Sequence, residues 1–311
     1  MISEMKKNSK NMIFSSFAAD SLALGVHWIY DTEIIRSKFG RVDRLLKPLA
    51  GSFHANKETG EFTHYGDQTL LLLEAISETS RFEQKLFAKS WFKFIETYQG
   101  YRDHATMDTI DNVKKGVPFK SAGSVSTDLG GASRISPIVF LYRNYPDEAV
   151  KAAMEQTALT HNNPVVLDAA HFFSRVALET LKGTPPVPAL IQISSNYFKD
   201  TQIQKWTLSG IESAATDTLQ VILHYGQMCD INAAFPSVIH LVAKYNNDLE
   251  NGLIANVMAG GDSAARGMLV GMVLGAFQGT KSLPEEWISG MKAFDRIYSA
   301  IERIEKQVSQ E

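Results

Sequence analysis

The sequence has little of what would tie it to an oxidising compartment, a nucleic acid or a membrane. It contains one cysteine, Cys229, so no intrachain disulfide can form and a reducing compartment fits best. Its 31 Lys and Arg residues are outnumbered by 34 Asp and Glu, and a net charge of −3 gives no basic field for nucleic acid. No apolar run reaches the roughly 20 residues that span a bilayer. We expect a cytoplasmic protein with a small-molecule partner, and no nucleic-acid or membrane partner.

The N-terminal segment resembles a signal peptide only loosely. Three lysines precede the apolar stretch 12–19, which is short, is interrupted by Ser15 and Ser16, and ends at Asp20. These features favour an amphipathic first helix over a cleaved leader.

Alternating strand patterns and flexible linkers are almost missing too, and helical periodicity dominates. Hydrophobic residues make up 44% of the chain, which is enough for a large core. The spacing of apolar residues predicts helices over 69–76, 82–98, 147–159, 165–181, 206–225, 232–245, 262–277 and 288–308. No repeat or Gly/Ser-rich linker divides the sequence. We expect an all-α fold with residues 1–311 in a single domain.

Clustered polar residues interrupt the helices in a few places, and the first cluster precedes a run of leucines at 70–73. An aspartate at a helix start caps free N–H groups, which would explain Asp67 alone. It does not explain why His64, Tyr65 and Gln68 gather around it.

The second cluster lies at the start of the helix expected over 262–277. Gly260 and Gly261 allow a close backbone approach to a ligand or another segment, and Asp262 occupies the helix start. Arg266 follows one turn later and can pair with Asp262. The helix is apolar all round, which indicates burial, and its glycines recur every four residues as a close-packing face: Gly267, Gly271 and Gly275.

Three weaker signals complete the set. His161 and Asn162 lie between two expected helices, where a structural histidine is as good a reading as a functional one. Gly130 and Gly131 precede Arg134, a pattern that suits an anion or a ribose phosphate. Near the N-terminus, Trp28 and Tyr30 can be read as core residues and Asp20 as a surface carboxylate.

In this order, the clusters resemble the ADP-ribosylglycohydrolase family over about residues 12–279. The resemblance implies an all-α, largely orthogonal helix bundle. It also implies that active members bind two magnesium ions and cleave an N- or O-glycosidic bond between ADP-ribose and a protein side chain or small acceptor.

The family's metal-ligand motifs are altered in this chain. The resemblance places Gly66-Asp67-Gln68-Thr69 at the family's Thr-Asp-Asp-Thr stretch, so that only its first aspartate and last threonine remain. At the family's Gly-Gly-Asp-Thr-Asp-Thr, Asp262 remains while Ala264 and Ala265 replace the later ligands.

Further positions follow from the same resemblance. The family's early acidic residue falls at His27, and Asp31 is a second candidate acid. The resemblance also places His161 beside the substrate ribose and Arg134 in the family's glycine-rich loop.

These departures change the expected chemistry. Magnesium prefers near-octahedral oxygen coordination, which two carboxylates and an amide supply poorly. Two buried carboxylates without a cation are costly, and Arg266 offers a fixed positive charge. Our hypothesis is therefore that Arg266 replaces the metal charge between Asp67 and Asp262, with no cofactor; bound Mg²⁺ is the alternative.

Two functions remain open at this point. The first is a metal-independent hydrolase of an ADP-ribosyl or related riboside substrate, because glycoside cleavage needs an acid and a base or nucleophile. Its candidate catalytic residues are Asp67, Asp262, His27 and Asp31, with His161 as another proton carrier. Its candidate substrate-binding residues are His64, Tyr65, Gln68, Gly130, Gly131, Arg134, His161, Asn162, Gly260 and Gly261.

The second function is a non-catalytic binding protein that keeps the cleft, as the crystallins of this family do. The metal-dependent hydrolase of the main family would need replacement ligands that the sequence does not show. An isoprenoid synthase would need aspartate-rich D-D-x-x-D helices, which are missing.

Overall fold

The computed structural model describes residues 2–279 and 282–308 of the chain. Within these ranges it has no β-strand, only two isolated bridges, between Ser124 and His161 and between Asp128 and Asp230. The elements are α1 (Ile2–Leu24), α2 (Thr32–Phe39), α3 (His64–Thr79), α4 (Gln84–Thr97), α5 (His104–Lys114), η1 (Phe119–Ser121), α6 (Gly130–Ser133), α7 (Ser136–Leu141), α8 (Pro146–Ala158), α9 (Pro164–Leu181), α10 (Pro186–Tyr197), α11 (Gln202–Glu212), η2 (Ser213–Ala215), α12 (Thr218–Tyr225), α13 (Ile231–Lys244), α14 (Leu249–Met258), α15 (Ser263–Gln278), α16 (Glu285–Ser289) and α17 (Phe294–Val308). The expected all-α class is confirmed.

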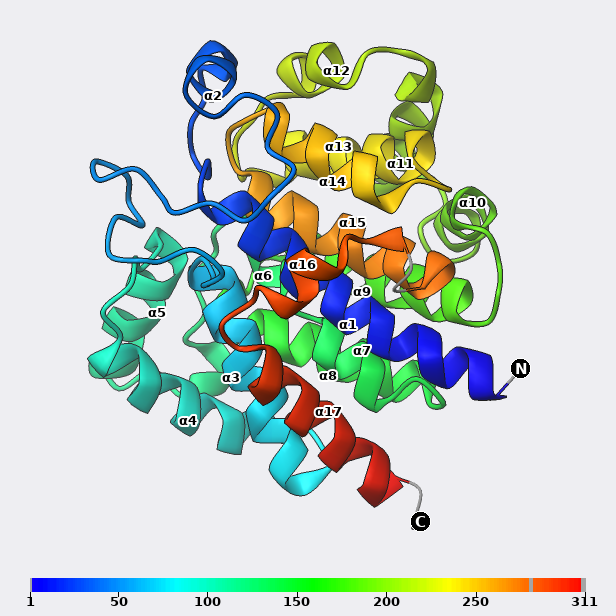
Figure 1. Cartoon of the computed structure of the whole chain (residues 1–311). Helices are drawn as coiled ribbons and strands as arrows, with labels where there is room; N and C mark the ends of the chain where they lie inside the picture. The colour runs from blue at the N-terminus through cyan, green and yellow to red at the C-terminus, as the bar shows by residue number, and fades with distance from the viewer. Residues whose placement is uncertain (1, 280–281, 309–311) are drawn as a thin grey trace.

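The centre of the molecule is the pair α1 and α15, which come from opposite ends of the chain and run side by side (Figure 1). The glycines spaced by four residues on α15 face α1. A Cβ at position 271 would lie 2.4 Å from the Ser15 carbonyl oxygen, and one at 275 would lie 2.6 Å from the Ser15 hydroxyl. The expected close-packing face is therefore present, and its partner is α1.

The first helix differs from the expectation. Every residue from Asn11 to Leu24 is buried, so this part of α1 is a core helix rather than an amphipathic surface helix. Its polar residues are mostly small serines, which let α15 approach where a larger side chain would not fit. Asp20, read from the sequence as a surface carboxylate, has no exposed surface.

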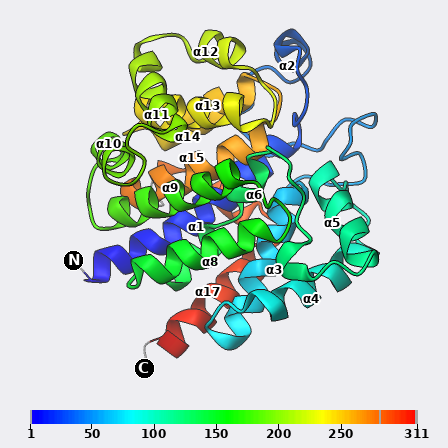
Figure 2. The same cartoon turned by 180° about the vertical axis from the view of Figure 1, so that it is seen from behind.

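The remaining helices cover this central pair. Figures 1 and 2 show α3, α4, α5 and α17 on one side, with α11, α12, α13 and α14 on the opposite side. Between them, α9 packs on α15, and α7 packs on α1. The continuous helix expected over 206–225 is two helices, because Asp217 caps a new start by accepting from the Gln220 N–H.

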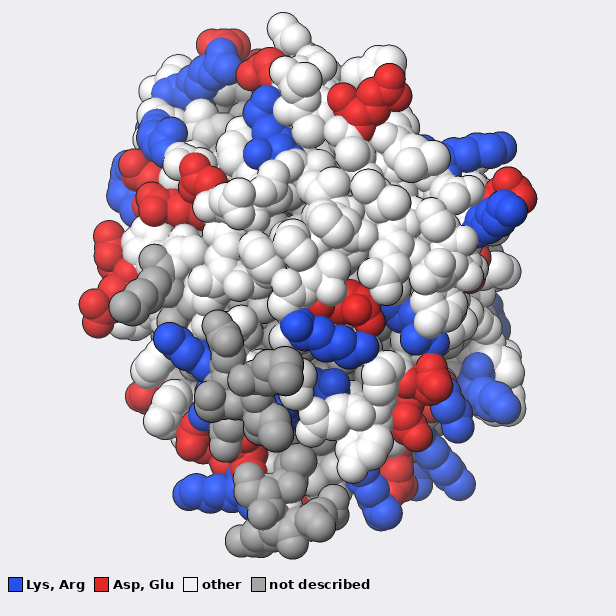
Figure 3. Space-filling model, turned by 90° about the vertical axis from the view of Figure 1, so that its right-hand side faces the viewer, with Lys and Arg blue, Asp and Glu red and all other residues white. Residues whose placement is uncertain are grey.

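No helix in the described ranges is long and apolar enough to cross a bilayer. On the face drawn in Figure 3, basic and acidic side chains alternate around a broad uncharged area, and neither sign forms a continuous patch.

Candidate active site

Three chain segments meet at the start of α15, and two glycines allow them to meet. Gly260 and Gly261 have φ angles of +70° and +66°, which favour glycine. A Cβ on Gly260 would lie 2.5 Å from the carbonyl oxygen of Ile29, and a Cβ on Gly261 would lie 2.2 Å from that of Gln227. The Gly261 N–H donates to Ile29 O at 2.8 Å, and the Trp28 N–H donates to Gly261 O at 2.9 Å. Gly260 and Gly261, which we expected at a binding site, thus allow the segments at Ile29 and Gln227 to pack against the start of α15.

The junction contains an ionisable side chain, that of Asp262, which is completely buried. Asp262 caps α15, because its Oδ1 accepts from the Ala265 N–H at 3.3 Å. Its Oδ2 accepts from the Trp28 indole Nε1 at 3.2 Å and from the Tyr65 hydroxyl at 3.0 Å. Burial raises the pKa of Asp262, while Arg266 and these hydrogen bonds act in the opposite direction.

Asp128 is the second carboxyl group of the site. Its Oδ1 accepts from the Gly130 N–H at 2.7 Å, and its Oδ2 lies 3.2 Å from the same Tyr65 hydroxyl. Carboxylate oxygens of Asp128 and Asp262 and the Cys229 sulfur all lie within 4.8 Å of one another. Burial and the charge of Asp262 raise the pKa of Asp128 well above its usual range. The two buried carboxyl groups therefore lie close enough that the charge of one disfavours ionisation of the other, and both contact the Tyr65 hydroxyl.

A pocket of about 500 Å³ opens beside Asp128, and we call it the aromatic pocket. Four aromatic rings, three aspartates and the thiol account for most of its wall: Trp28, Tyr30, Phe53, Tyr101, Asp103, Asp128, Asp230 and Cys229. Phe53 and Tyr30 are well exposed at 64% and 49%. Burial and the charges of Asp128 and Asp262 raise the pKa of Cys229, which disfavours a thiolate nucleophile.

Asp103 differs from Asp128 in its protonation. It caps α5, accepting from the Thr106 N–H at 2.6 Å, and its Oδ2 lies 3.3 Å from His64 Nε2. Burial acts to raise the pKa of Asp103, but the adjacent His64 lowers that pKa far below the usual range. The pocket thus has one carboxyl group that favours its proton and one that is ionised, the separation that acid and base roles require.

Asp67 has other partners. It accepts from Lys57 Nζ and from the Tyr98 hydroxyl, in a small pocket of about 110 Å³ outside the aromatic pocket. The reason is helical geometry, because residues two positions apart point to opposite sides of a helix and Tyr65 faces Asp262. The arrangement expected from the sequence, with Asp67 and Asp262 around one arginine, is replaced by two separate environments.

Arg266 is buried and holds the junction together. Its guanidinium donates to Asn256 Oδ1 at 3.1 Å, to Gln227 O at 3.1 Å and to Gly260 O at 2.6 Å. It acts on Asp262 through its charge, while Lys57 is the cation beside Asp67. The hypothesis that Arg266 lies between two aspartates is therefore not what the structure shows.

The two candidate acids near the N-terminus, His27 and Asp31, line a second pocket of about 610 Å³ beside the aromatic pocket. His27 is buried and stacks on Trp28 with ring centroids 4.4 Å apart, and neither ring nitrogen has a hydrogen-bond partner. Burial lowers the pKa of His27, so it is neutral. Asp31 is an exposed cap of α2 that accepts from the Glu33 N–H. His27 thus supports the indole of the site, and Asp31 lies on the surface.

The candidate anion site is filled by protein side chains. A Cβ on Gly130 would lie 2.2 Å from the Tyr65 ring, and one on Gly131 would lie 2.6 Å from the His161 side chain. These glycines therefore make room for Tyr65 and His161 rather than for a phosphate.

The charged residue of that candidate site is engaged as well. The Arg134 guanidinium is buried and donates to Gln68 Oε1 and to the Thr160 hydroxyl. His161 Nδ1 pairs with the same hydroxyl at 2.9 Å, and the Asn162 N–H donates to Ser124 O. These residues form a buried network under the pocket floor.

Sequence reasoning missed several residues of the site. Asp128 and Cys229 are joined only by long-range contacts, and Asp103 resembles any other helix cap. Trp28 was read as a core residue, although its φ of +64° marks an unusual backbone that sets the indole against Asp262. The clustering of His64 and Tyr65 in the sequence is the signal that points to this junction.

The residues present do not fit a dinuclear magnesium site. Ala264 and Ala265 carry no ligand atom, and Asp262 already accepts from an indole N–H, a hydroxyl and a backbone N–H. The cluster of Asp128, Cys229 and Asp262 includes a thiol, which magnesium avoids in favour of oxygen.

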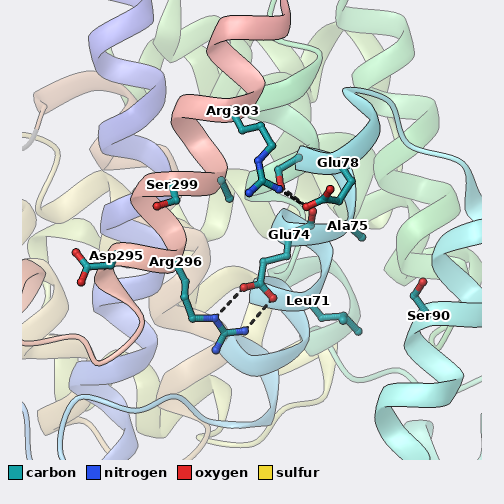
Figure 4. A pocket seen from close by; sticks show the side chains of 11 residues that line it. Leu71, Glu74, Ala75, Glu78, Ser90, Asp295, Arg296, Ser299 and Arg303 are labelled. Atoms are coloured by element: carbon teal, nitrogen blue, oxygen red, sulfur yellow. Dashed lines mark hydrogen bonds and ion pairs between the residues drawn. The ribbon is translucent and has the colours of Figure 1, made fainter.

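Another pocket, of about 560 Å³, lies between α3 and α17 (Figure 4). Both of its arginines are paired with glutamates, because Arg296 forms two hydrogen bonds with Glu74 and Arg303 pairs with Glu78. The aromatic pocket is therefore the better candidate for chemistry.

Comparisons with known proteins agree with this fold. An uncharacterised protein of Archaeoglobus fulgidus is 26% identical over 309 residues, which cover 93% of this chain and 92% of that protein. Crystallin J1A of Tripedalia cystophora is 22% identical and covers 98% of both chains. The ADP-ribosyl-[dinitrogen reductase] glycohydrolase of Rhodospirillum rubrum is 26% identical over about half of each chain.

A solved structure described as an ADP-ribosylglycohydrolase-related protein complex has a TM-score of 0.73 at 18% identity, with 98% of this chain and 99% of that chain covered. The family model for ADP-ribosylglycohydrolase matches residues 3–311. The chain belongs to the ADP-ribosylglycohydrolase family.

Proposed function

We propose that this protein hydrolyses the glycosidic bond of an ADP-ribosyl or related riboside substrate, and that it does so without two magnesium ions. The observation that carries the proposal is the Asp128–Tyr65–Asp262 chain of hydrogen bonds at the wall of the aromatic pocket. Family membership supports a glycohydrolase-like activity.

The roles of the residues follow from their positions. A hydroxyl has one proton, so Tyr65 can donate to one carboxyl group only and accept from the other. Asp128 keeps its proton more readily than Asp262, which has more donors. The arrangement is therefore Asp128–OH to Tyr65 Oη, and Tyr65 O–H to the Asp262 carboxylate. Asp128 lines the pocket and is the general acid, while the buried Asp262 positions its proton.

Asp103 supplies a negatively charged carboxylate in the same pocket as the protonated Asp128. An ionised carboxylate stabilises the oxocarbenium-like centre that forms as a glycosidic bond breaks, and it orients the attacking water. His64 at 3.3 Å keeps Asp103 in this state. The mechanism thus uses Asp128 and Asp103 in place of the candidates Asp67 and Asp31.

A second candidate function is a binding protein without catalysis. The similarity to crystallins J1A and J1B of Tripedalia cystophora favours this function, because both are 22% identical to this chain over more than nine-tenths of its length. Such a protein would keep the pocket and would release no product.

The test is a product assay with ADP-ribosyl and simple riboside substrates in the presence of EDTA. We expect product release that Asp128→Asn lowers by roughly 10²- to 10⁴-fold. Asp217→Asn is the matched control, because this exposed aspartate also caps a helix and asparagine caps as well. Saturable binding without any product would support the second function and contradict the first.

A further inference from the structure

The aromatic pocket combines rings and carboxylates without a strong cation. Asp103, Asp128 and Asp230 lie in its wall, and no Lys or Arg is among the described residues that line it. The buried guanidinium groups beneath it, Arg134 and Arg266, are engaged by protein acceptors. A pyrophosphate in this pocket would meet negative charge, whereas a flat ring that becomes positive would be stabilised by both rings and carboxylates.

The rings form one continuous wall. Trp28, Phe53 and Tyr101 pack edge to face, with centroids 4.8 to 5.3 Å apart. The Trp28 indole is fixed by its hydrogen bond to Asp262 and by His27 stacked on it. Phe53 is exposed at the mouth of the pocket. Rigid aromatic side chains of this kind recognise heterocyclic bases, because every base has a π-face.

A carboxyl group that can supply a proton lines the same space. Asp128 lines the pocket beside the rings and is connected to Asp262 through Tyr65. We propose that the substrate is an N-riboside whose heteroaromatic base, of the purine type, stacks in the aromatic pocket and takes a proton from Asp128 as it leaves. This inference rests on the proposed function and names its substrate class.

The step balances in atoms and charge. The Asp128 proton moves to a ring nitrogen of the base, and the bond between C1′ and the glycosidic nitrogen breaks with its electron pair going to the base. The base then leaves neutral. Water bonds to C1′ and gives a proton to the Asp103 carboxylate and then to solvent, and Asp128 regains a proton from solvent. The products are ribose and the free base.

Two ribosides test this directly. The inosine base needs a proton to leave, whereas the pyridinium ring of nicotinamide riboside leaves as a neutral molecule without one. We expect Asp128→Asn to lower kcat/KM for inosine at least 100-fold and for nicotinamide riboside less than fivefold. Equal losses for the two substrates would overturn the inference.

The outcomes also separate this inference from the proposed function. Hydrolysis of ADP-ribosyl substrates alone, with neither riboside cleaved, would overturn the inference and leave the proposed function standing. Failure to hydrolyse any of these substrates would overturn both.

A second variant tests the stacking surface without risk to the core. Phe53→Leu changes a side chain that is 64% exposed, and Tyr145→Leu changes one that is 60% exposed and outside the pocket. We expect the KM for inosine to rise roughly tenfold in Phe53→Leu and to stay within twofold in Tyr145→Leu. An unchanged KM in Phe53→Leu would overturn the placement of the base.

Discussion

Asp128→Asn should make Asp262 titrate at a lower pH than the last proton of the wild-type pair, because it removes the neighbouring carboxyl group. Carboxylate oxygens of the two residues lie within 4.8 Å of each other. With an effective dielectric constant of about 20, two unit charges at that distance repel by about 3.5 kcal/mol. Because this repulsion disfavours the doubly ionised state, the higher pKa of the pair should lie above the pKa of Asp262 alone.

The measurement is a carboxyl carbon NMR titration of aspartate-labelled protein. In the wild type, the last proton of the pair should leave at a higher pH than the Asp262 proton leaves in Asp128→Asn. The Asp217→Asn control should titrate like the wild type. If Asp262 in Asp128→Asn kept the higher pKa of the pair, the two carboxyl groups would not be coupled, and the shared proton and the acid role of Asp128 would be refuted.

The remaining predictions concern stability and metal binding. Burial raises the pKa of Asp20 to about 6, so between pH 4 and 6 the folded state keeps a proton that the unfolded state releases. The free energy of unfolding, measured with urea, should therefore fall by about 3 kcal/mol as the pH rises through this range. The Asp20→Asn variant should not show this fall. Gly271→Ala should destabilise by roughly 1–3 kcal/mol, because its Cβ would collide with Ser15 O, whereas Gly51→Ala has open space and should be neutral in the same assay. Calorimetry should detect no tight stoichiometric magnesium binding; such binding would contradict our reading of the Asp262 donors.

Helix periodicity predicted most of the fold, because the apolar faces of these helices are long and regular. The buried character of α1 was not predictable in the same way. Its serines and Asn11 read as a polar face, yet they are buried against the glycines of α15, more than 250 residues later in the sequence. Only the close approach of two backbones explains why small polar residues lie in the core.

At the candidate site, the residue of α3 that meets Asp262 differs from the one expected from the sequence. The sequence pointed to the start of α3 and to Gly260-Gly261-Asp262, and the structure brings both to one junction. The helix begins at His64, because Thr63 caps it and Asp20 in turn accepts from the Thr63 N–H at 2.8 Å. That contact fixes which face of the first turn meets Asp262, and it joins residues too far apart for sequence spacing to reveal. Tyr65 therefore occupies the position expected for Asp67.

The register of this one turn determines how the site balances its charge. Two carboxyl groups this close cannot both stay ionised in a buried place without compensation. A metal ion is one form of compensation, but one oxygen of Asp262 already accepts from the indole N–H of Trp28 and the hydroxyl of Tyr65. A proton held between Asp128 and Tyr65 is the other form, and unlike a metal it can be transferred to a substrate. On the function that we propose, the changes at the family's ligand positions do not by themselves imply the loss of catalysis, since Asp262 is left beside Asp128, which would hold a transferable proton.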